Sequence, residues 1–369
     1  MINLRKCAFL PVLLLVAGCQ VVTAPPRPAV DIVNSIAAER DGSYHHMLSS
    51  FAAPDKDGSI ALIGTASQCD TLLSLFAACD RHDNVDGKPI ADGLPDFAGE
   101  QIFGYADASS ASYESILSSG NTDVLRDFVV RASLAAVDSV YSITQYDIEG
   151  QGRKSPAKLL VLADPCYDIY GQFDIDTLMQ ITGCGISTIT PMGAAFDEVC
   201  SASSALATIG VLTDPDWSGK GLYPEIIRQE FSARKLAGAE AVVFSVRDST
   251  DALIDFLDKY IASGHDSRLD AIIVDDLSVD VAAMNETLGR ITSVASQESV
   301  TYGKLVAPDL HIISTTDALM NVCYRTLRSQ NTFTHNISFP ETGSFFSVKN
   351  PAEGQEGYLF IRNIAHVQY

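Results

Sequence analysis

The sequence predicts an α/β fold with two lobes, a parallel-sheet sandwich, followed by a C-terminal β extension. Short β-branched runs alternate with longer amphipathic stretches through most of the 369 residues, and this alternation is typical of parallel sheets with helices on their faces. A long polar stretch at 80–121 interrupts the compact, even repeat of a TIM barrel. Two lobes with ligands at the carboxyl ends of the strands therefore fit the pattern better.

The expected strands share short apolar cores rich in β-branched residues. They are residues 60–64, 101–105, 158–163, 185–189, 208–212, 241–246, 271–275 and 311–314. The expected helices share an amphipathic period. They are residues 68–78, 122–142, 175–182, 193–201, 220–236, 250–263, 280–297 and 316–329. In the helix at 250–263, for example, Thr250 can cap the N-terminus and Gly264 can end the helix.

The body divides into a first lobe, a second lobe and a return to the first lobe, at residues 55–205, 206–304 and 305–330. Residues 331–369 lack helical periodicity. Within them, the apolar runs Phe345–Val348 and Tyr358–Ile361 are separated by Pro351 and several glycines, which predicts an appended hairpin.

Residues 1–18 are expected to be a lipoprotein signal peptide. Arg5 and Lys6 precede an apolar run at 8–17. This run is shorter than the roughly 20 residues of a membrane span and fits the apolar core of a secretory signal. The run ends in Val16-Ala17-Gly18-Cys19, which resembles a bacterial lipobox. The resemblance implies cleavage before Cys19 and lipidation of that cysteine, which gives stable membrane anchoring.

An ordinary secretory signal or a short anchor helix is the alternative. Residues 19–54 are then expected to be the lipidated cysteine and a tether, which opens with Pro25 and Pro26. Gln20 follows the lipid cysteine, where Asp would suggest retention in the inner membrane. We therefore expect a protein of the bacterial cell envelope, anchored by lipid to the outer membrane.

The charge balance excludes several partners. Lys and Arg number 25 and Asp and Glu 46, which gives a net charge of −21. Nucleic-acid binders and proteins that dock electrostatically on anionic lipid need basic surfaces. No nucleic-acid partner is expected. The sequence has no CxxC, P-loop or GxSxG motif. We expect neither a metal nor a cofactor. Six cysteines follow Cys19, and these allow either three disulfides or free buried thiols.

Ligands of open α/β sheets bind beyond the carboxyl ends of the strands, so the residues that follow each strand are the candidates. The carboxyl and thiol groups there, candidates for catalysis or ligand binding, are Asp164, Cys166 and Asp276. The candidate ligand-binding side chains are Thr65, Ser67, Thr213, Asp214 and Thr315. Helix caps and turns use the same residue types, and this is the alternative role. If Asp164 and Asp276 face each other, crowding should raise the pKa of one of them.

Several short motifs resemble the aspartate/glutamate racemase superfamily over roughly 58–328. Gly64-Thr65 stands in a small-residue loop after the first strand, and Ile209-Gly210 opens a later strand. Gly221-Leu222-Tyr223 follows at the spacing of that family, and Asp270–Asp276 and Ile312–Leu327 resemble its last strands and helix. The resemblance implies a two-lobed fold with a cleft for an amino acid or small carboxylate.

The same resemblance implies two cysteines on opposite faces of the substrate. Here Asp164 and Asp276 occupy those positions, and Pro165 and Cys166 replace the Asn and Thr that follow the first cysteine. A carboxylate is a much weaker base than a thiolate near neutral pH. We therefore expect a cleft that binds a small polar ligand without two-cysteine racemisation. The alternatives are an isomerase, lyase or hydrolase that uses the paired aspartates, or a structural lipoprotein with a vestigial cleft.

Overall fold

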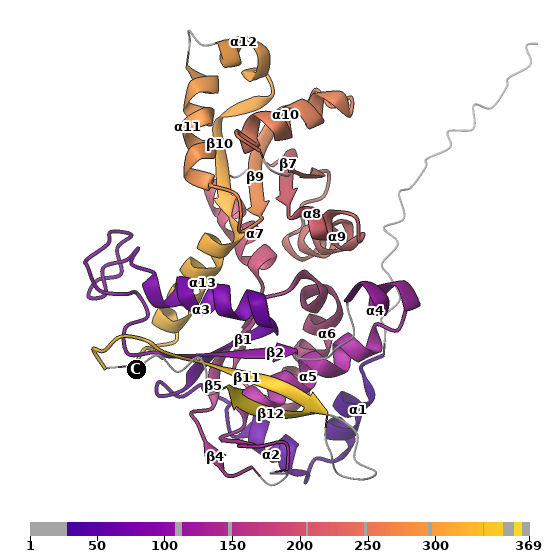
Figure 1. Ribbon diagram of the computed structural model, residues 1–369, viewed down its shortest axis with the longest axis vertical. Helices are drawn as coiled ribbons and strands as arrows, with labels where there is room; N and C mark the ends of the chain where they lie inside the picture. The colour runs from indigo at the N-terminus through magenta and orange to yellow at the C-terminus, as the bar shows by residue number, and fades with distance from the viewer. Residues whose placement is uncertain are drawn as a thin grey trace, which may run out of the picture.

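The computed structural model describes residues 28–107, 113–146, 150–203, 206–246, 249–293, 297–334, 336–349 and 358–363. The expected signal peptide and Cys19 lie outside these residues. Figure 1 shows two lobes, one above the other. Among the described residues, no helix is both long and apolar enough to cross a membrane.

The first lobe contains a six-stranded sheet. In spatial order its strands are β12 (Tyr358–Asn363), β11 (Glu341–Lys349), β2 (Gln101–Asp107), β1 (Ser59–Thr65), β5 (Ala157–Leu162) and β6 (Ser187–Ile189). All neighbours are parallel except β11 and β12, which form the antiparallel C-terminal hairpin. The second lobe contains a four-stranded parallel sheet in the order β10 (Val306–Ser314), β9 (Leu269–Asp275), β7 (Thr208–Thr213) and β8 (Glu240–Ser245). The predicted fold class is confirmed.

Helices cover both sheets. Those of the first lobe are α1 (Asp31–Ala38), α2 (Ser43–Ser49), α3 (Ala66–Ala78), α4 (Tyr113–Ser119), α5 (Asp123–Val137), α6 (Pro165–Thr182) and α7 (Pro191–Ala202). Those that follow are α8 (Pro215–Ser218), α9 (Leu222–Arg234), α10 (Ala252–Ala262), α11 (Val281–Thr292), α12 (Gln297–Tyr302) and α13 (Thr315–Ser329). A short ladder pairs β3 (Val140–Tyr141) with β4 (Gly152–Arg153).

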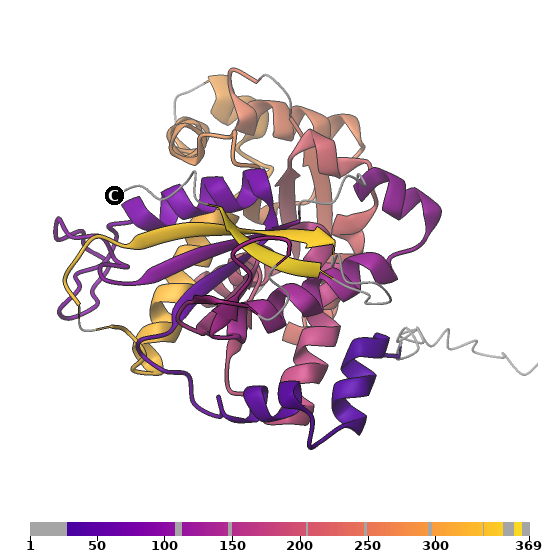
Figure 2. The same ribbon diagram turned by 60° about the horizontal axis from the view of Figure 1, so that its bottom comes forward.

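The helices lie on opposite faces of the first sheet. Figure 2 shows α3 on one face and α5 on the other. A Cβ at Gly104 of β2 would stand 2.9 Å from Cys69 of α3, so the absence of a side chain lets α3 pack closely on the sheet. Because side chains alternate along a strand, the neighbouring Tyr105 points to the α5 face. Its ring is fully buried there.

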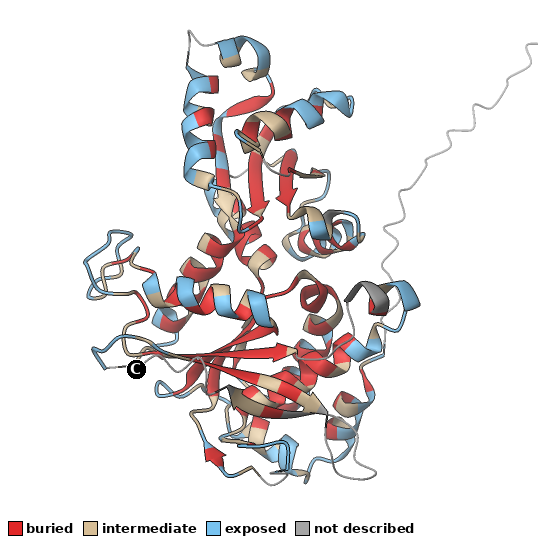
Figure 3. Cartoon of the chain, in the orientation of Figure 1, coloured by how far each residue is buried: buried red, intermediate tan, exposed pale blue. Residues whose placement is uncertain are grey.

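The two lobes share a continuous apolar core. Helix α13 leaves β10 and packs on α7, and its Leu319, Cys323 and Leu327 belong to the core of the first lobe. Ile209 and Ile273 of the second sheet join the same core. A separate core lies on the outer side of the second sheet, around Leu253, Phe256 and Tyr260 of α10. Figure 3 shows the strands of both sheets buried and the outer turns of α10, α11 and α12 exposed.

Three local differences from the sequence expectations have physical causes. The helix expected at 122–142 ends at Val137, because Asp138 is extended and residues 140–141 pair with β4. The helix expected at 175–182 begins at Pro165, where Asp164 caps its first turn. Part of the segment expected as a tether is helical, because α1 and α2 bury Val33 and Leu48 against the first lobe.

The six cysteines of the described chain are all free thiols: Cys69, Cys79, Cys166, Cys184, Cys200 and Cys323. Four of them are buried in the apolar interior. Of the two alternatives left by the sequence, the structure therefore has the free buried thiols.

Candidate functional site

A cleft with a volume of about 430 Å³ lies between the lobes. The carboxyl ends of strands from both sheets reach it, as do the N-termini of α3, α6, α7 and α13. The lining residues are Thr65, Ser67, Gln68, Thr71, Leu72, Ala163, Pro165, Pro191, Asp214, Trp217, Tyr223, Asp275, Asp276, Leu277, Ser278, Thr315, Thr316 and Leu319. The location is the one that parallel sheets generally use for ligands.

The four helices α3, α6, α7 and α13 each have a side-chain cap at the cleft. Thr65 and Gln68 form a reciprocal capping box on α3. The Thr65 hydroxyl accepts a hydrogen bond from the backbone N–H of Gln68 at 3.3 Å, and the Gln68 side chain accepts one from the backbone N–H of Thr65. Thr190 caps α7 and Ser314 caps α13, at 3.1 and 3.3 Å. These caps fix the helix ends that carry the positive pole of the helix dipole. The side of the cleft formed by these helices is therefore suited to an anionic group.

The end of β9 supplies an acidic side to the same cleft. Asp275 accepts a hydrogen bond from the Tyr223 hydroxyl at 2.5 Å and another from the Thr315 hydroxyl at 2.6 Å. Burial raises the pKa of Asp275, and the two hydroxyl bonds lower it again. The next residue, Asp276, accepts at one oxygen from the Ser278 amide and hydroxyl, at 2.8 and 2.6 Å. Its other oxygen, Oδ2, is buried and has no hydrogen-bond partner.

Asp164 lies directly behind the cleft wall, between the lining residues Ala163 and Pro165. Its Oδ1 accepts from the Cys166 amide at 2.7 Å, which caps α6, and its Oδ2 has no partner. Burial raises the pKa of Asp164 to about 7, although contacts with Cys166 and Gln68 act in the opposite direction. The main cause is loss of solvent, so crowding by Asp276 is not needed to explain the shift.

A single lysine offsets part of the acidity of the cleft. The positive charge of Lys220 lowers the pKa of Asp164. The ammonium group of Lys220 lies 4.1 Å from the centre of the Trp217 ring, which lines the cleft. This stacking holds the charge over an aromatic face at the cavity edge.

A second acidic layer lies deeper. Asp168 of α6 is buried, and burial together with the nearby charges of Glu230 and Asp275 raises its pKa to about 7. The Thr190 side chain bonds to Asp168 and lowers its pKa again. Glu230 in turn pairs with Arg234. Asp164 and Asp168, both behind the cleft, therefore have pKa values near neutral pH.

The structure brings together most of the residues expected at the strand ends. Thr65, Ser67, Asp214, Asp276 and Thr315 line the cleft. The other three, Asp164, Cys166 and Thr213, are buried and lie outside the set of lining residues.

The Cys166 thiol does not provide a reactive thiolate. Burial and the neighbouring Asp164 raise the pKa of Cys166 far above its usual range. The thiol is therefore protonated at neutral pH.

Sequence reasoning missed three residues of the site. The sequence favours Asp276 over Asp275, although both carboxylate oxygens of Asp275 accept hydrogen bonds and only one oxygen of Asp276 does. In the sequence, Tyr223 stands out only as part of the Gly221-Leu222-Tyr223 motif. Its hydrogen bond to Asp275 joins elements that are distant in the chain. Gln68 could have been found, because the spacing Thr65-x-x-Gln68 is that of a capping box.

Within the described part of the chain, no group of three or more His, Cys, Asp or Glu side chains is arranged to hold a metal ion.

No protein-family model matches the sequence, and no curated protein matches it. Several solved structures are similar to this chain. A glutamate racemase from Bacillus anthracis is 13% identical, with 80% of this chain and 90% of that chain covered and a TM-score of 0.41. A glutamate racemase from Aquifex pyrophilus is 10% identical, with 79% and 90% covered and a TM-score of 0.39. An unliganded arylmalonate decarboxylase is 13% identical, with 73% and 92% covered and a TM-score of 0.33. All three similarities are remote, and none shows a ligand or a reaction for this chain.

Proposed function

We propose that the cleft between the lobes binds a small polar molecule that carries both an amine and a carboxylate. One observation supports this proposal: helix N-termini and the three aspartates Asp214, Asp275 and Asp276 line a single cavity. Helix N-termini favour a carboxylate. Asp276 offers a carboxylate oxygen without a partner, and an ammonium group is the natural donor to it. An amino acid satisfies both requirements.

We propose further that the cleft does not racemise its ligand by a two-thiol mechanism. That mechanism needs a thiolate on each side of the ligand, and Asp164 and Asp276 stand at the two strand ends concerned. The neighbouring thiol, Cys166, is fully buried and its pKa is raised. A binding role therefore agrees better with the chemistry of these side chains.

The N-terminal segment adds a location to the proposal. The lipobox-like Val16-Ala17-Gly18-Cys19 supports a protein of the bacterial cell envelope, anchored by lipid on Cys19 to the outer membrane. In that compartment, a cleft for an amino acid or a small carboxylate belongs to a protein that captures such molecules outside the cytoplasm.

Thermal unfolding and calorimetry with a panel of L- and D-amino acids, simple carboxylates and simple amines test the ligand class. A ligand at about 100 times its Kd should stabilise the protein by roughly 2.7 kcal/mol. Amino acids should stabilise more than either the matching carboxylate or the matching amine. Stabilisation by none of the panel would contradict the proposal.

Two variants locate the binding event. Asp276→Asn removes the negative charge that receives the amine, and its affinity should fall about tenfold or more, since a hydrogen bond to a charged group contributes about 1.5–3 kcal/mol. Asp309→Asn is the matched control, because Asp309 is exposed on β10. Equal loss in both variants would show that the effect is not specific to the cleft.

One observation favours a second candidate function, an acid–base enzyme. The pKa of Asp164 is raised to about 7, which is the range that suits a general acid or base. This function requires that Asp164→Asn and Asp276→Asn each abolish turnover without unfolding the protein. Exchange of the α-proton of bound amino acids in deuterated water is the direct assay, and full exchange in either variant would exclude it.

A further inference from the structure

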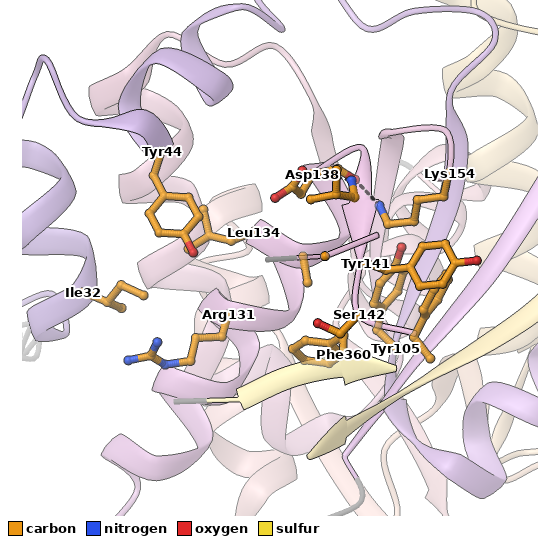
Figure 4. Close-up of a pocket in the computed structure, with 14 residues that line it drawn as sticks. Ile32, Tyr44, Tyr105, Arg131, Leu134, Asp138, Tyr141, Ser142, Lys154 and Phe360 are labelled. Carbon is orange, nitrogen blue, oxygen red and sulfur yellow. Dashed lines mark hydrogen bonds between the residues drawn. The ribbon is translucent and has the colours of Figure 1, made fainter. Parts of the chain in front are cut away.

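A second pocket, of about 210 Å³, lies on the α5 face of the first sheet. Side chains from distant parts of the chain meet there: the N-terminal helices, β2, α5, the β3–β4 ladder and the C-terminal hairpin (Figure 4). It shares no lining residue with the cleft between the lobes. The C-terminal extension is therefore a structural part of a separate cavity.

Aromatic rings form one wall of this pocket. The rings of Tyr105 and Phe345 stack with their centres 5.0 Å apart and their planes at 13°. The ring of Tyr141 meets Phe345 edge-on at 5.2 Å, and that of Phe360 lies 6.0 Å from Tyr105. Such an arrangement is a preformed surface for another flat ring.

The position of the Tyr141 ring depends on the absence of a side chain at Gly152. The two residues face each other across the β3–β4 ladder. A Cβ at Gly152 would stand 2.3 Å from the Tyr141 ring. Any other residue at this position would push the ring away, so the wall depends on the glycine.

The pocket contains a buried hydroxyl without a partner. The Tyr105 side chain is fully buried, and its hydroxyl oxygen has no hydrogen-bond partner. A buried hydroxyl without a hydrogen-bond partner destabilises the folded protein. A ligand oxygen that accepts from this hydroxyl would remove that destabilisation.

The pocket also contains Lys154, which forms no ion pair with a carboxylate of the described residues. Lys154 Nζ donates to the carbonyl of Ala136 at 2.8 Å and to that of Asp138, and it lies 5.7 Å from the centre of the Tyr105 ring. Burial lowers the pKa of Lys154 to about 7, and the nearby charge of Asp138 acts in the opposite direction. In its protonated form the amine has three donors, so one remains. The Asp138 carboxylate accepts from the Val140 amide instead. Figure 4 shows Lys154, Tyr141 and Tyr105 on the same side of the pocket.

The two pockets differ in charge. Arg131 and Lys154 line this one with a single acid, Asp138. The lining of the cleft between the lobes holds three aspartates and no lysine or arginine. Arg131 is already paired with Asp127 at 2.7 Å, so Lys154 is the lining cation that can receive an anion.

We propose that this second pocket binds a small aromatic carboxylate, with its ring against Tyr105, Tyr141 and Phe345 and its carboxylate beside Lys154 and the Tyr105 hydroxyl. The carboxylate would form an ion pair with Lys154 and would supply the missing acceptor for Tyr105. The volume of about 210 Å³ limits the ligand to one ring with a short acid arm.

Calorimetric titration of the full chain with phenylacetate tests this proposal. Phenylacetamide, which lacks the charge, and acetate, which lacks the ring, are the matched ligands. Phenylacetate should bind at least tenfold more tightly than either. Equal binding of phenylacetate and phenylacetamide, or no binding of phenylacetate at millimolar concentration, would overturn the proposal.

Three variants place the ligand. Tyr105→Phe removes only a hydroxyl that has no partner, so the fold should persist while affinity for phenylacetate falls about tenfold. Lys154→Met should abolish binding, whereas Arg153→Met, which changes an exposed neighbour, should leave it within twofold. Unchanged affinity in Tyr105→Phe and Lys154→Met would refute the placement.

Asp276→Asn separates this proposal from that for the cleft. The variant alters only the cleft, and phenylacetate should bind it as tightly as it binds the parent protein. If Asp276→Asn abolishes phenylacetate binding, the ligand occupies the cleft and the second pocket is not its site.

Discussion

Asp164→Asn should make the protein more stable, and the gain should grow as the pH rises from about 4 to about 7. Asp164 is fully buried at the start of α6, and burial raises its pKa to about 7 from the usual 3.8. Asparagine has nearly the same shape and caps helices as well as aspartate does. Its side-chain oxygen can still accept from the Cys166 amide, so the substitution removes the charge and keeps the cap.

The magnitude follows from the pKa difference. The unfolded chain loses the Asp164 proton near pH 4, whereas the folded protein keeps it until about pH 7. Below about pH 4 the Asp164 carboxyl group is protonated in both the folded and the unfolded state, so its ionisation does not change the free energy of unfolding. Between about pH 4 and about pH 7, the folded protein binds more protons than the unfolded chain, so stability falls as the pH rises. The pKa of Asp164 differs by about three between the folded and unfolded states, which lowers the free energy of unfolding by about 4 kcal/mol above pH 7. The asparagine variant carries no titrating carboxyl group, so its free energy of unfolding is not lowered in this way.

Urea unfolding followed by circular dichroism at several pH values between about 4 and 8 measures the effect. The difference between variant and parent should be small near pH 4 and should reach several kcal/mol at pH 8. Asp280→Asn is the control, because Asp280 caps α11 in the same way but is exposed; a surface change of this kind should stay within about 0.5 kcal/mol. A difference that does not change with pH would refute the assignment of a buried, protonated Asp164.

Three further outcomes are expected. Lys158→Met should destabilise the protein by about 3–5 kcal/mol in urea unfolding, because it leaves Glu100, now 2.6 Å from the lysine, buried and uncompensated; adding Glu100→Gln should recover part of the loss. Gly171→Ala should cost about 1–3 kcal/mol, because its Cβ would stand 2.6 Å from Val129 where α5 and α6 pack, and Val129→Ala should relieve it. Cys19→Ser should abolish incorporation of labelled palmitate in cells and release the protein from the membrane fraction; unchanged labelling would contradict a lipid anchor on Cys19.

The strands and the two-lobed arrangement were predictable because buried parallel strands leave a strong local signal. Leu159–Leu162 is apolar at every position, and Ile209–Leu212 is apolar at every position except Gly210. The site followed from the same regularity, since residues at the carboxyl ends of parallel strands converge. Thr65, Asp276 and Thr315 lie in one cleft for that reason.

Long-range partners could not be predicted in the same way. The bond between Tyr223 and Asp275 joins helix α9 to strand β9, which lies three elements later, and nothing local in either segment indicates it. Lys154 sits in a weakly patterned stretch, and its pocket is completed by Phe345 and Phe360 of the C-terminal hairpin. The start of α6, in contrast, has a local signal. Asp164 followed by Pro165 is a typical N-cap and first-turn pair, although the polar residues after it weaken the helical pattern.

The order of strands in the first sheet has a consequence for synthesis of the chain. β2 is bordered on one side by β1 and on the other by β11, which begins only at Glu341, after the whole second lobe. While the ribosome makes residues 206–314, β2 therefore presents an open edge, and open edges attract other strands. The second lobe can close before β11 and β12 are made, whereas the sheet of the first lobe cannot. The first lobe is therefore begun before the second and completed after it, and its protection from mispairing depends on residues 341–363.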